Sequence, residues 1–381
     1  MVEFLYIHIP FCIKKCLYCD FISIPYNISL VEDYINALCK ELTLKKHLAK
    51  TLKSIYIGGG TPSILSEKCF QQIFLCLKDN YNLSSYIEIT VEVNPGMFNE
   101  SKLTNLLSLG VNRISIGIQS FDNRELQILG RIHNSADAIK AITLIKKSGL
   151  KNYSIDLMYG IPGQTIDSWK KSLSKAIAFS PSHISAYELT LEENTPLFEI
   201  IKKWKNKGTS RKLKMLDEDI ILQMYNYTID YLANSGFEHY EISNFAVPGY
   251  NCLHNINYWD RGQYIGTGVG AHSFIGNLRS ENTGNIYRYI EDLRKSKIPE
   301  TYSIQLTPDE SLKELIFLGL RKRKGVNISK LKVFKPILLQ ECEELFKLGY
   351  MVIEKGHLRL TRKGINISNK IVLEVFDSLG L

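Results

Sequence analysis

Hydrophobic and polar residues follow a repeating order over the first half of the chain. A short run of β-branched residues leads into a turn with polar residues or glycine, and a stretch with apolar residues at helical spacing follows. Gly110 and Gly149 end two of these stretches, as helix stop signals do. The predicted strands cover residues 4–9, 54–57, 87–91, 113–116, 153–158 and 184–189, and the predicted helices cover residues 31–48, 67–79, 101–109, 136–148 and 166–179.

Six βα units in sequence predict an α/β fold with a parallel sheet. In a barrel of parallel strands the C-terminal ends of the strands meet on one face, where such barrels build their sites. The unusual residues of the chain fall at these ends, so we expect one site made from many strands. They are the cysteines after the first strand, the sequence GGGTP at residues 58–62 after the second, Glu92 and Asn94 at the end of the third, Gln119 after the fourth, Asp156 in the fifth, and Tyr187 and Glu188 at the end of the sixth.

The repeating order stops near residue 235. Residues 244–285 are rich in Gly, Asn, Tyr and Trp and have no clear periodicity, which predicts a structured loop. The chain is therefore expected to contain a core of residues 1–235, a loop-rich connection of residues 236–300 and a small C-terminal domain of residues 301–381.

The C-terminal segment predicts several helices followed by a hairpin, an order that resembles a winged helix. Such domains often bind DNA, but they also serve as packing modules, so this fold alone does not decide the function. The predicted helices cover residues 309–320, a segment near 327–334, and residues 337–348, and the predicted hairpin covers residues 351–360.

The composition excludes several classes of protein. Of the 381 residues, 45% are hydrophobic and 23% are charged, which excludes a fibrous or disordered chain. Apolar runs end well before the roughly 18 residues of a membrane-spanning helix. No signal-peptide pattern precedes Tyr6, so we expect a cytoplasmic protein. The net charge is +8, but acids are interspersed with the bases, so we expect a solvated surface and no nucleic-acid site.

Three cysteines lie close together near the start of the chain. Cys12, Cys16 and Cys19 form a CxxxCxxC pattern, which favours a cytosolic metal site over disulfides. Three thiolates with one open position suit a catalytic zinc site or a [4Fe–4S] cluster with one iron free. Structural zinc sites usually use two separated pairs, and the chain has no second pair. His8 remains the alternative fourth ligand of a zinc site.

The surrounding sequence resembles a known family. YIHIPFC at residues 6–12 and CLYCDF at residues 16–21 are similar to the radical S-adenosylmethionine (SAM) superfamily, in its group of oxygen-independent coproporphyrinogen III dehydrogenases (HemN) and HemW-type haem chaperones. The resemblance covers almost the full chain and implies a partial (β/α)6 radical SAM barrel with a small helical, winged-helix-like C-terminal domain. It implies a [4Fe–4S] cluster on the three cysteines, with the fourth iron left for SAM.

The resemblance also implies a SAM site. Glu92 and Asp156 have the strongest support from the residues themselves, because acids within apolar strand sequence are costly to bury unless they are bonded. The assignment of Arg131 depends on the family match. By resemblance, Tyr6 would contact the cofactor beside the cluster, Tyr18 the adenine, Gly59, Gly60 and Thr61 the methionine end, Glu92 the amino group or a ribose hydroxyl, Gln119 and Asp156 the ribose, and Arg131 the carboxylate.

Two members of the group differ in function, and the differences favour the chaperone. The dehydrogenase has a fourth cysteine where this chain has Phe21, and a long extension where this chain has eleven residues before Cys12. HNINYW at residues 254–259 matches the HNxxYW motif associated with haem binding in the chaperones. His254 is therefore a candidate haem ligand, since imidazole ligates haem iron. Direct axial ligation is a hypothesis.

We therefore expect a haem chaperone that binds haem and transfers it to an acceptor protein, with a [4Fe–4S] cluster and SAM. One alternative is the oxygen-independent coproporphyrinogen III dehydrogenase, which decarboxylates propionates oxidatively. A second is a zinc-bearing winged-helix nucleic-acid binder. The sequence leaves open the identity of the acceptor, its association with a membrane, the cleavage of SAM, the catalytic residues and the formation of a homodimer.

Overall fold

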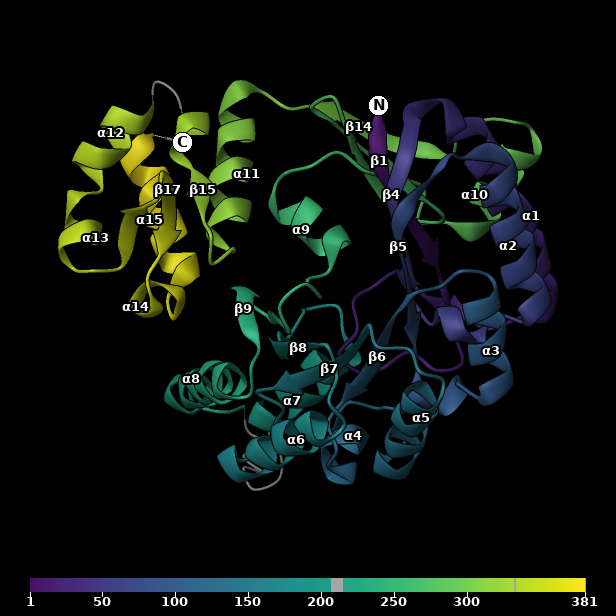
Figure 1. Ribbon diagram of the computed structural model, residues 1–381, viewed down its shortest axis with the longest axis horizontal. Coiled ribbons are helices and arrows are strands. Elements are labelled where there is room, and N and C mark those ends of the chain that lie inside the picture. The colour runs from purple at the N-terminus through teal and green to yellow at the C-terminus, as the bar shows by residue number, and fades with distance from the viewer. Residues whose placement is uncertain (207–214, 332–333, 381) are drawn as a thin grey trace.

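A computed structural model describes residues 1–206, 215–331 and 334–380. It shows a large curved sheet with helices along its outer side and a smaller domain at the C-terminus (Figure 1). Within the described residues, the large sheet is parallel from β11 to β8 and continues with antiparallel β10 and β9. In spatial order its strands are β11 (Ile265–Thr267), β1 (Val2–Ile9), β4 (Ala49–Gly59), β5 (Leu83–Val93), β6 (Arg113–Gln119), β7 (Tyr153–Tyr159), β8 (His183–Glu188), β10 (Asn244–Ala246) and β9 (Glu238–Glu241).

Helices connect the parallel strands across the outer side of the sheet (Figure 1). The α/β class, the parallel sheet and the six successive βα units predicted from the pattern are confirmed. Strands β4 and β5 begin earlier than predicted, because their first residues are mostly polar and break the apolar run. The helices are α1 (Ile28–Lys45), α2 (Glu67–Asn80), α3 (Glu100–Ser108), α4 (Asn123–Ile128), α5 (Ser135–Lys147), α6 (Ile166–Ala178), α7 (Pro196–Asn206) and α8 (Glu218–Asn234).

The strands carry apolar side chains on the outer face of the sheet and polar side chains on the inner face. In β6, Ile114, Ile116 and Ile118 are fully buried in the core. Arg113 and Ser115 have the opposite orientation and are also buried. Most parallel sheets have nearly continuous apolar strands. This sheet instead collects polar groups in the interior of the barrel, where each needs a hydrogen-bond partner.

Helix α9 (Leu253–Trp259) packs against the inner face of the sheet and lies between the sheet and the C-terminal domain (Figure 1). The Glu88 carboxylate on β5 accepts hydrogen bonds from the Leu253 and His254 backbone amides at 3.2 and 3.3 Å. The rings of His254 and Tyr56 lie 5.3 Å apart. The first turn of α9 thus satisfies a carboxylate inside the barrel.

Residues 244–285, predicted as a structured loop, contain regular structure. Strand β11 pairs with β1, and β10 pairs with β8, so this segment supplies strands to both sides of the sheet. The strands are three to five residues long, which is too short for a periodic pattern to be recognised. The segment also contains β12 (His272–Ile275) and β13 (Leu278–Asn282). These two strands form a small sheet with β14 (Glu300–Gln305), and α10 (Ile286–Arg294) lies between β13 and β14 in the chain.

The C-terminal domain has the expected hairpin, and α11 confirms the helix predicted over residues 309–320, while the helix predicted over residues 337–348 is divided into two. Strands β16 and β17 pair over the predicted hairpin, and β15 adds a third strand. The helix predicted near 327–334 is β15, a 3-10 turn and the start of α12, with residues 332–333 outside the described part. The elements are α11 (Pro308–Leu320), β15 (Val326–Asn327), α12 (Phe334–Glu341), α13 (Glu343–Lys347), β16 (Met351–Glu354), β17 (His357–Leu360), α14 (Arg362–Ile365) and α15 (Ser368–Leu379).

The C-terminal domain is joined to the barrel at the edge of the large sheet. The amides of Ile242 and Arg323 donate to the carbonyls of Arg321 and Tyr240, each at 3.0 Å. Residues 321–323 therefore cover the open edge of β9. Among the described residues, no helix combines the length and the apolar character that a membrane-spanning segment requires.

Candidate functional site

The three cysteines lie in a loop whose two ends are tied together. Strand β2 (Phe11–Cys12) pairs with β3 (Ile24–Pro25), and the Tyr26 amide donates to the Cys12 carbonyl at 2.9 Å. The Cys19 amide donates to the Cys16 carbonyl at 3.3 Å, which makes a turn between these two cysteines. The loop is therefore closed at its base before any cofactor is bound.

Leu17 anchors the middle of this loop to the barrel. Its amide donates to the Leu129 carbonyl at 2.9 Å, and its carbonyl accepts from the Leu197 amide at 2.8 Å. Its side chain packs against a small apolar cluster around Leu129 and Leu197. Gly130 has a φ of +70°, and a Cβ at this position would lie 2.7 Å from the Leu17 Cγ. Glycine is thus required here both for the backbone conformation and for space.

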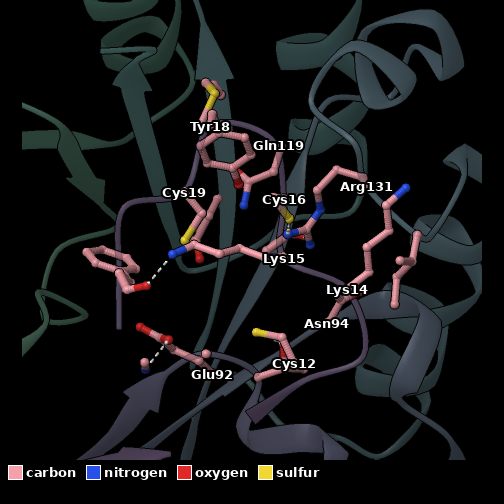
Figure 2. Close-up of a pocket in the computed structure, with 18 of the residues that line it drawn as sticks. Cys12, Lys14, Lys15, Cys16, Tyr18, Cys19, Glu92, Asn94, Gln119 and Arg131 are labelled. Atoms are coloured by element: carbon pink, nitrogen blue, oxygen red, sulfur yellow. Dashed lines mark hydrogen bonds between the residues drawn. The ribbon is translucent and has the colours of Figure 1, made fainter. Parts of the chain in front are cut away.

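A cavity of about 400 Å³ lies at the C-terminal ends of the strands and contains the three cysteines (Figure 2). Almost all the residues expected to bind SAM line the same cavity, although they come from six different segments of the chain. Tyr6 is the exception. The expected residues that line the cavity are Cys12, Cys16, Cys19, Tyr18, Gly59, Gly60, Thr61, Glu92, Gln119, Arg131 and Asp156.

Glu92 lies in the wall of this cavity with two protein donors. Its carboxylate accepts from the Tyr56 hydroxyl at 2.8 Å and from the Gly59 amide at 3.1 Å. Burial raises the pKa of Glu92 to about 7, and these two hydrogen bonds oppose that shift. Near neutral pH the carboxyl is therefore close to half ionised, and a cationic or hydroxyl-bearing ligand would favour its charged form.

Arg131 contacts a cysteine of the loop. Its Nη1 donates to the Cys16 Sγ at 3.3 Å, and its Nη2 donates to the Gly117 carbonyl at 2.6 Å, while its buried Nε has no partner. In Figure 2 the Arg131 guanidinium points toward Cys16. The guanidinium therefore places positive charge beside the Cys16 sulfur, and its Nε is a buried donor without a protein partner.

Asp156 and Gln119 are also engaged by the protein. The Asp156 carboxylate accepts from the hydroxyls of Ser115 and Ser154, both at 2.8 Å, and burial raises its pKa. The Gln119 side chain accepts a hydrogen bond from the Tyr187 hydroxyl. Gln119 has a φ of +67°, which is uncommon for a residue other than glycine and clusters at functional sites.

The glycines of the GGGTP sequence have a structural reason beyond access for a ligand. A Cβ at Gly59 would lie 2.5 Å from the His8 ring, and a Cβ at Gly60 would lie 2.9 Å from the Phe11 carbonyl oxygen. These residues let the end of β4 approach the end of β1. Thr61 follows these glycines and contacts the cysteine loop, where its Oγ1 lies 3.5 Å from the Cys12 Sγ.

The donor set of the cavity fits a [4Fe–4S] cluster. Within the described residues, no three His, Cys, Asp or Glu side chains converge on a point where they could hold a single ion. The three thiols instead border one cavity, as a cluster with one thiolate on each of three irons requires. Burial raises the pKa of Cys19 to about 11 and also raises that of Cys12, so both are neutral thiols before metal binds. His8, the alternative zinc ligand, bonds the Tyr6 hydroxyl and the Ile22 carbonyl instead.

Tyr6 lines a second cavity, of about 460 Å³, on the other side of a shared wall. Four residues line both cavities and form the wall between them, namely Asp20, Phe21, Gly59 and Glu92. Tyr6 therefore does not line the first cavity, which contains the three cysteines and is called the cluster cavity below. It supports the wall, because its ring stacks 6.2 Å from that of Tyr56, which bonds Glu92.

His254 is buried in the barrel interior, with 1% of its surface exposed. Its Nδ1 is 3.1 Å from the Ser54 hydroxyl and its Nε2 is 3.0 Å from the Tyr258 hydroxyl. Burial, with the positive charge of Arg113, lowers the pKa of His254 to about 3. The imidazole is therefore neutral, and both ring nitrogens already have partners.

Sequence reasoning missed several polar residues of the cavity, among them Ser115 and Lys15. Ser115 orients Asp156, and its place in the polar alternation of β6, with Gly117 and Gln119, could have revealed it. Lys15 lines the cavity and donates to the Phe21 carbonyl at 3.0 Å. Nothing in the sequence distinguishes Lys15 from a solvated lysine.

Comparisons with known proteins identify the family and the fold. Residues 6–176 match the family model of the radical SAM superfamily, and residues 306–367 match that of the HemN C-terminal domain. The heme chaperone HemW of Lactococcus lactis is 33% identical over 96% of this chain and 95% of its own length, and that of Bacillus subtilis is 37% identical over 96% and 97%. The solved structure of coproporphyrinogen III oxidase (HemN) from Escherichia coli has a TM-score of 0.82, with 22% identity over 97% of this chain and 89% of that one, and shows the shared fold.

The anchoring of Leu17 makes a prediction for the cluster. Gly130→Ala should displace Leu17 and with it the cysteine loop, so that reconstituted iron and sulfide fall well below the wild-type content. Gly110→Ala is the matched control, since Gly110 also has a positive φ (+98°) but no atom within 4 Å of an added Cβ. Because the added methyl group overpacks the site, the free energy of unfolding should fall about 1–3 kcal/mol more in Gly130→Ala than in the control. Equal iron content in both variants would contradict the anchoring role.

The raised pKa of Glu92 predicts a pH dependence of SAM binding. A carboxyl with a pKa of about 7 is mostly ionised at pH 8 and mostly protonated at pH 6, and only the ionised form accepts hydrogen bonds on both oxygens. The ratio of wild-type to Glu92→Gln affinity should therefore fall about tenfold from pH 8 to pH 6. Both affinities can be measured by anaerobic calorimetric titration. Their ratio cancels the effect that protonation of SAM itself has on binding. An unchanged ratio would show that Glu92 does not act as a charged acceptor.

Proposed function

Because the chain belongs to the HemW family of the radical SAM superfamily, we propose that it is a haem chaperone that binds haem and transfers it to an acceptor protein. The observation that carries this proposal is the similarity over nearly the full length of both chains to proteins named as heme chaperones. Transfer to an acceptor, and the cofactors that accompany it, are the finer parts of the proposal.

The cluster cavity supports a role for a [4Fe–4S] cluster and SAM in this function. Cys12, Cys16 and Cys19 would hold the cluster, and a reduced cluster supplies an electron to the sulfonium of SAM when both are bound. Glu92 and Asp156 would position the cofactor by accepting from its amino or hydroxyl groups. Arg131 would hold Cys16 and keep positive charge next to the cluster.

Phe21 favours the chaperone over the dehydrogenase of the same group. It stands where the resemblance places a fourth cysteine in the dehydrogenase, and 63% of its surface is exposed at the wall shared by the two cavities. An exposed aromatic ring at this place suits contact with an apolar cargo.

We place the haem near residues 244–275 and the protein in the cytoplasm. The segment carries the HNxxYW motif, and its helix α9 borders the second cavity through Tyr258. All eight cysteines are free thiols, which fits a reducing compartment. The acceptor is a protein that is either soluble or associated with a membrane, and binding experiments would identify it. The formation of a homodimer is a separate question for the same kind of experiment.

One reconstitution experiment separates the candidate functions. Protein purified anaerobically and supplied with iron, sulfide and haem should contain about four irons per chain and a stoichiometric haem band, and should leave coproporphyrinogen III unconverted in the presence of SAM and a reductant. Conversion of coproporphyrinogen III without a haem band would identify a dehydrogenase. Zinc in place of iron would contradict the radical SAM assignment.

Matched cysteine variants control this experiment. Cys16→Ser should lose the cluster, because it removes one of three thiolates. Cys39→Ser should keep the wild-type iron content, because Cys39 lies on α1 at a distance from the cavity and outside its lining. Iron loss in both variants would indicate general instability.

A further inference from the structure

One histidine has a free imidazole ring beside the wall of the cavity that contains the cysteines. Of the eight histidines, all in the described part of the chain, His272 is the one that forms no hydrogen bond through its ring. It is exposed and lines the second cavity. His254, by contrast, is buried, and both of its ring nitrogens have hydrogen-bond partners. A haem iron could reach the His254 Nε2 only after the bond to Tyr258 broke and the porphyrin entered the barrel interior.

The second cavity has the walls that a flat, apolar macrocycle requires. Four aromatic rings border it, from β1, from the loop after the cysteines and from the segment that carries the HNxxYW motif. Aromatic walls with a few polar groups are typical of small-molecule sites. The rings are those of Tyr6, Phe21, Tyr258 and Tyr264.

His272 has a fixed position at this cavity. It is the first residue of β12 and pairs with Glu281 of β13. The backbone of β11 packs directly on it, because a Cβ at Gly266 would lie 1.9 Å from the His272 carbonyl oxygen. The backbone is thus held on two sides, while the imidazole remains free to donate a lone pair to a metal.

We propose that haem binds in the second cavity with its iron ligated by His272, beside the wall that separates this cavity from the cluster. This inference rests on the proposed haem-chaperone function and names its binding site. A ring nitrogen of His272 would donate its lone pair to the iron and replace a water or another weak ligand. In this arrangement Tyr258 and Tyr264 face the macrocycle, and His254 positions Tyr258 from within the barrel.

The charges around the cavity give the haem one orientation. Asp20 and Glu92 stand on the wall shared with the cluster cavity. The two haem propionates would be repelled by these acids, so they lie toward the open side. An open cavity with one exposed protein ligand also suits a cargo that must leave again, since ligand exchange at His272 needs no unfolding of the barrel.

The test is the haem spectrum of cluster-loaded protein titrated anaerobically with ferric haem. His272→Ala should lower the haem affinity by roughly tenfold or more, about 1.4 kcal/mol, and should change the electron paramagnetic resonance and resonance Raman signatures of the iron ligand. Free imidazole should restore the wild-type signatures, because the cavity mouth is open. His272→Cys should replace the imidazole signature by that of a thiolate.

Two further variants decide against the alternatives. His47→Ala removes another exposed histidine, at the end of α1, and should leave haem binding unchanged. His254→Gln keeps hydrogen-bonding capacity inside the barrel and should retain the imidazole signature. The proposal is overturned if His272→Ala and His272→Cys keep the wild-type signature, if His254→Gln alone loses it, or if His47→Ala weakens binding equally. If the wild-type protein binds no haem at all, the proposed function fails, and with it the site.

Discussion

Polar side chains on the inner face of the sheet must find hydrogen-bond partners in the barrel interior, and the rest of the structure follows from this requirement. A buried polar group without a partner costs about 1–3 kcal/mol. Asp156 meets Ser115 of the neighbouring strand, and Glu88 meets the backbone of helix α9. Helix α9 also brings His254 to Ser54 of β4. Helix α9 thus supplies partners to the inner face of the sheet, while the Arg131 Nε in the wall of the first cavity is a buried donor without a protein partner.

The cysteine loop depends on a different constraint, which is local packing. The loop has few contacts of its own, and the two backbone hydrogen bonds of Leu17 fix its course against the barrel. Because Gly130 leaves room for Leu17, the position of the thiols depends on a residue that comes more than one hundred positions later in the chain. The arrangement of the three cysteines is therefore a product of the folded barrel, although they lie within eight residues of one another in sequence.

The two cavities on either side of one wall give the proposed cofactors and the proposed haem separate places. Gly59 and Glu92 belong to this wall, and Tyr56 and Tyr6 stiffen it from behind. The cluster cavity collects thiols and hydrogen-bonding groups, as a polar cofactor requires. The neighbouring cavity collects aromatic rings and one free imidazole, as a porphyrin requires.

The sequence by itself determined the βα order, and it singled out the three cysteines and most of the other residues that line the first cavity. These features are carried by periodic apolar runs, by the spacing of three cysteines and by acids such as Glu92 and Asp156 in apolar strands, all of which are local patterns. Only the tertiary structure decided the places of Tyr6 and His254, the course of residues 244–285 and the availability of His272. The physical reason is that these depend on partners far away in the chain, such as Ser54 for His254, and on strands too short to have a recognisable period.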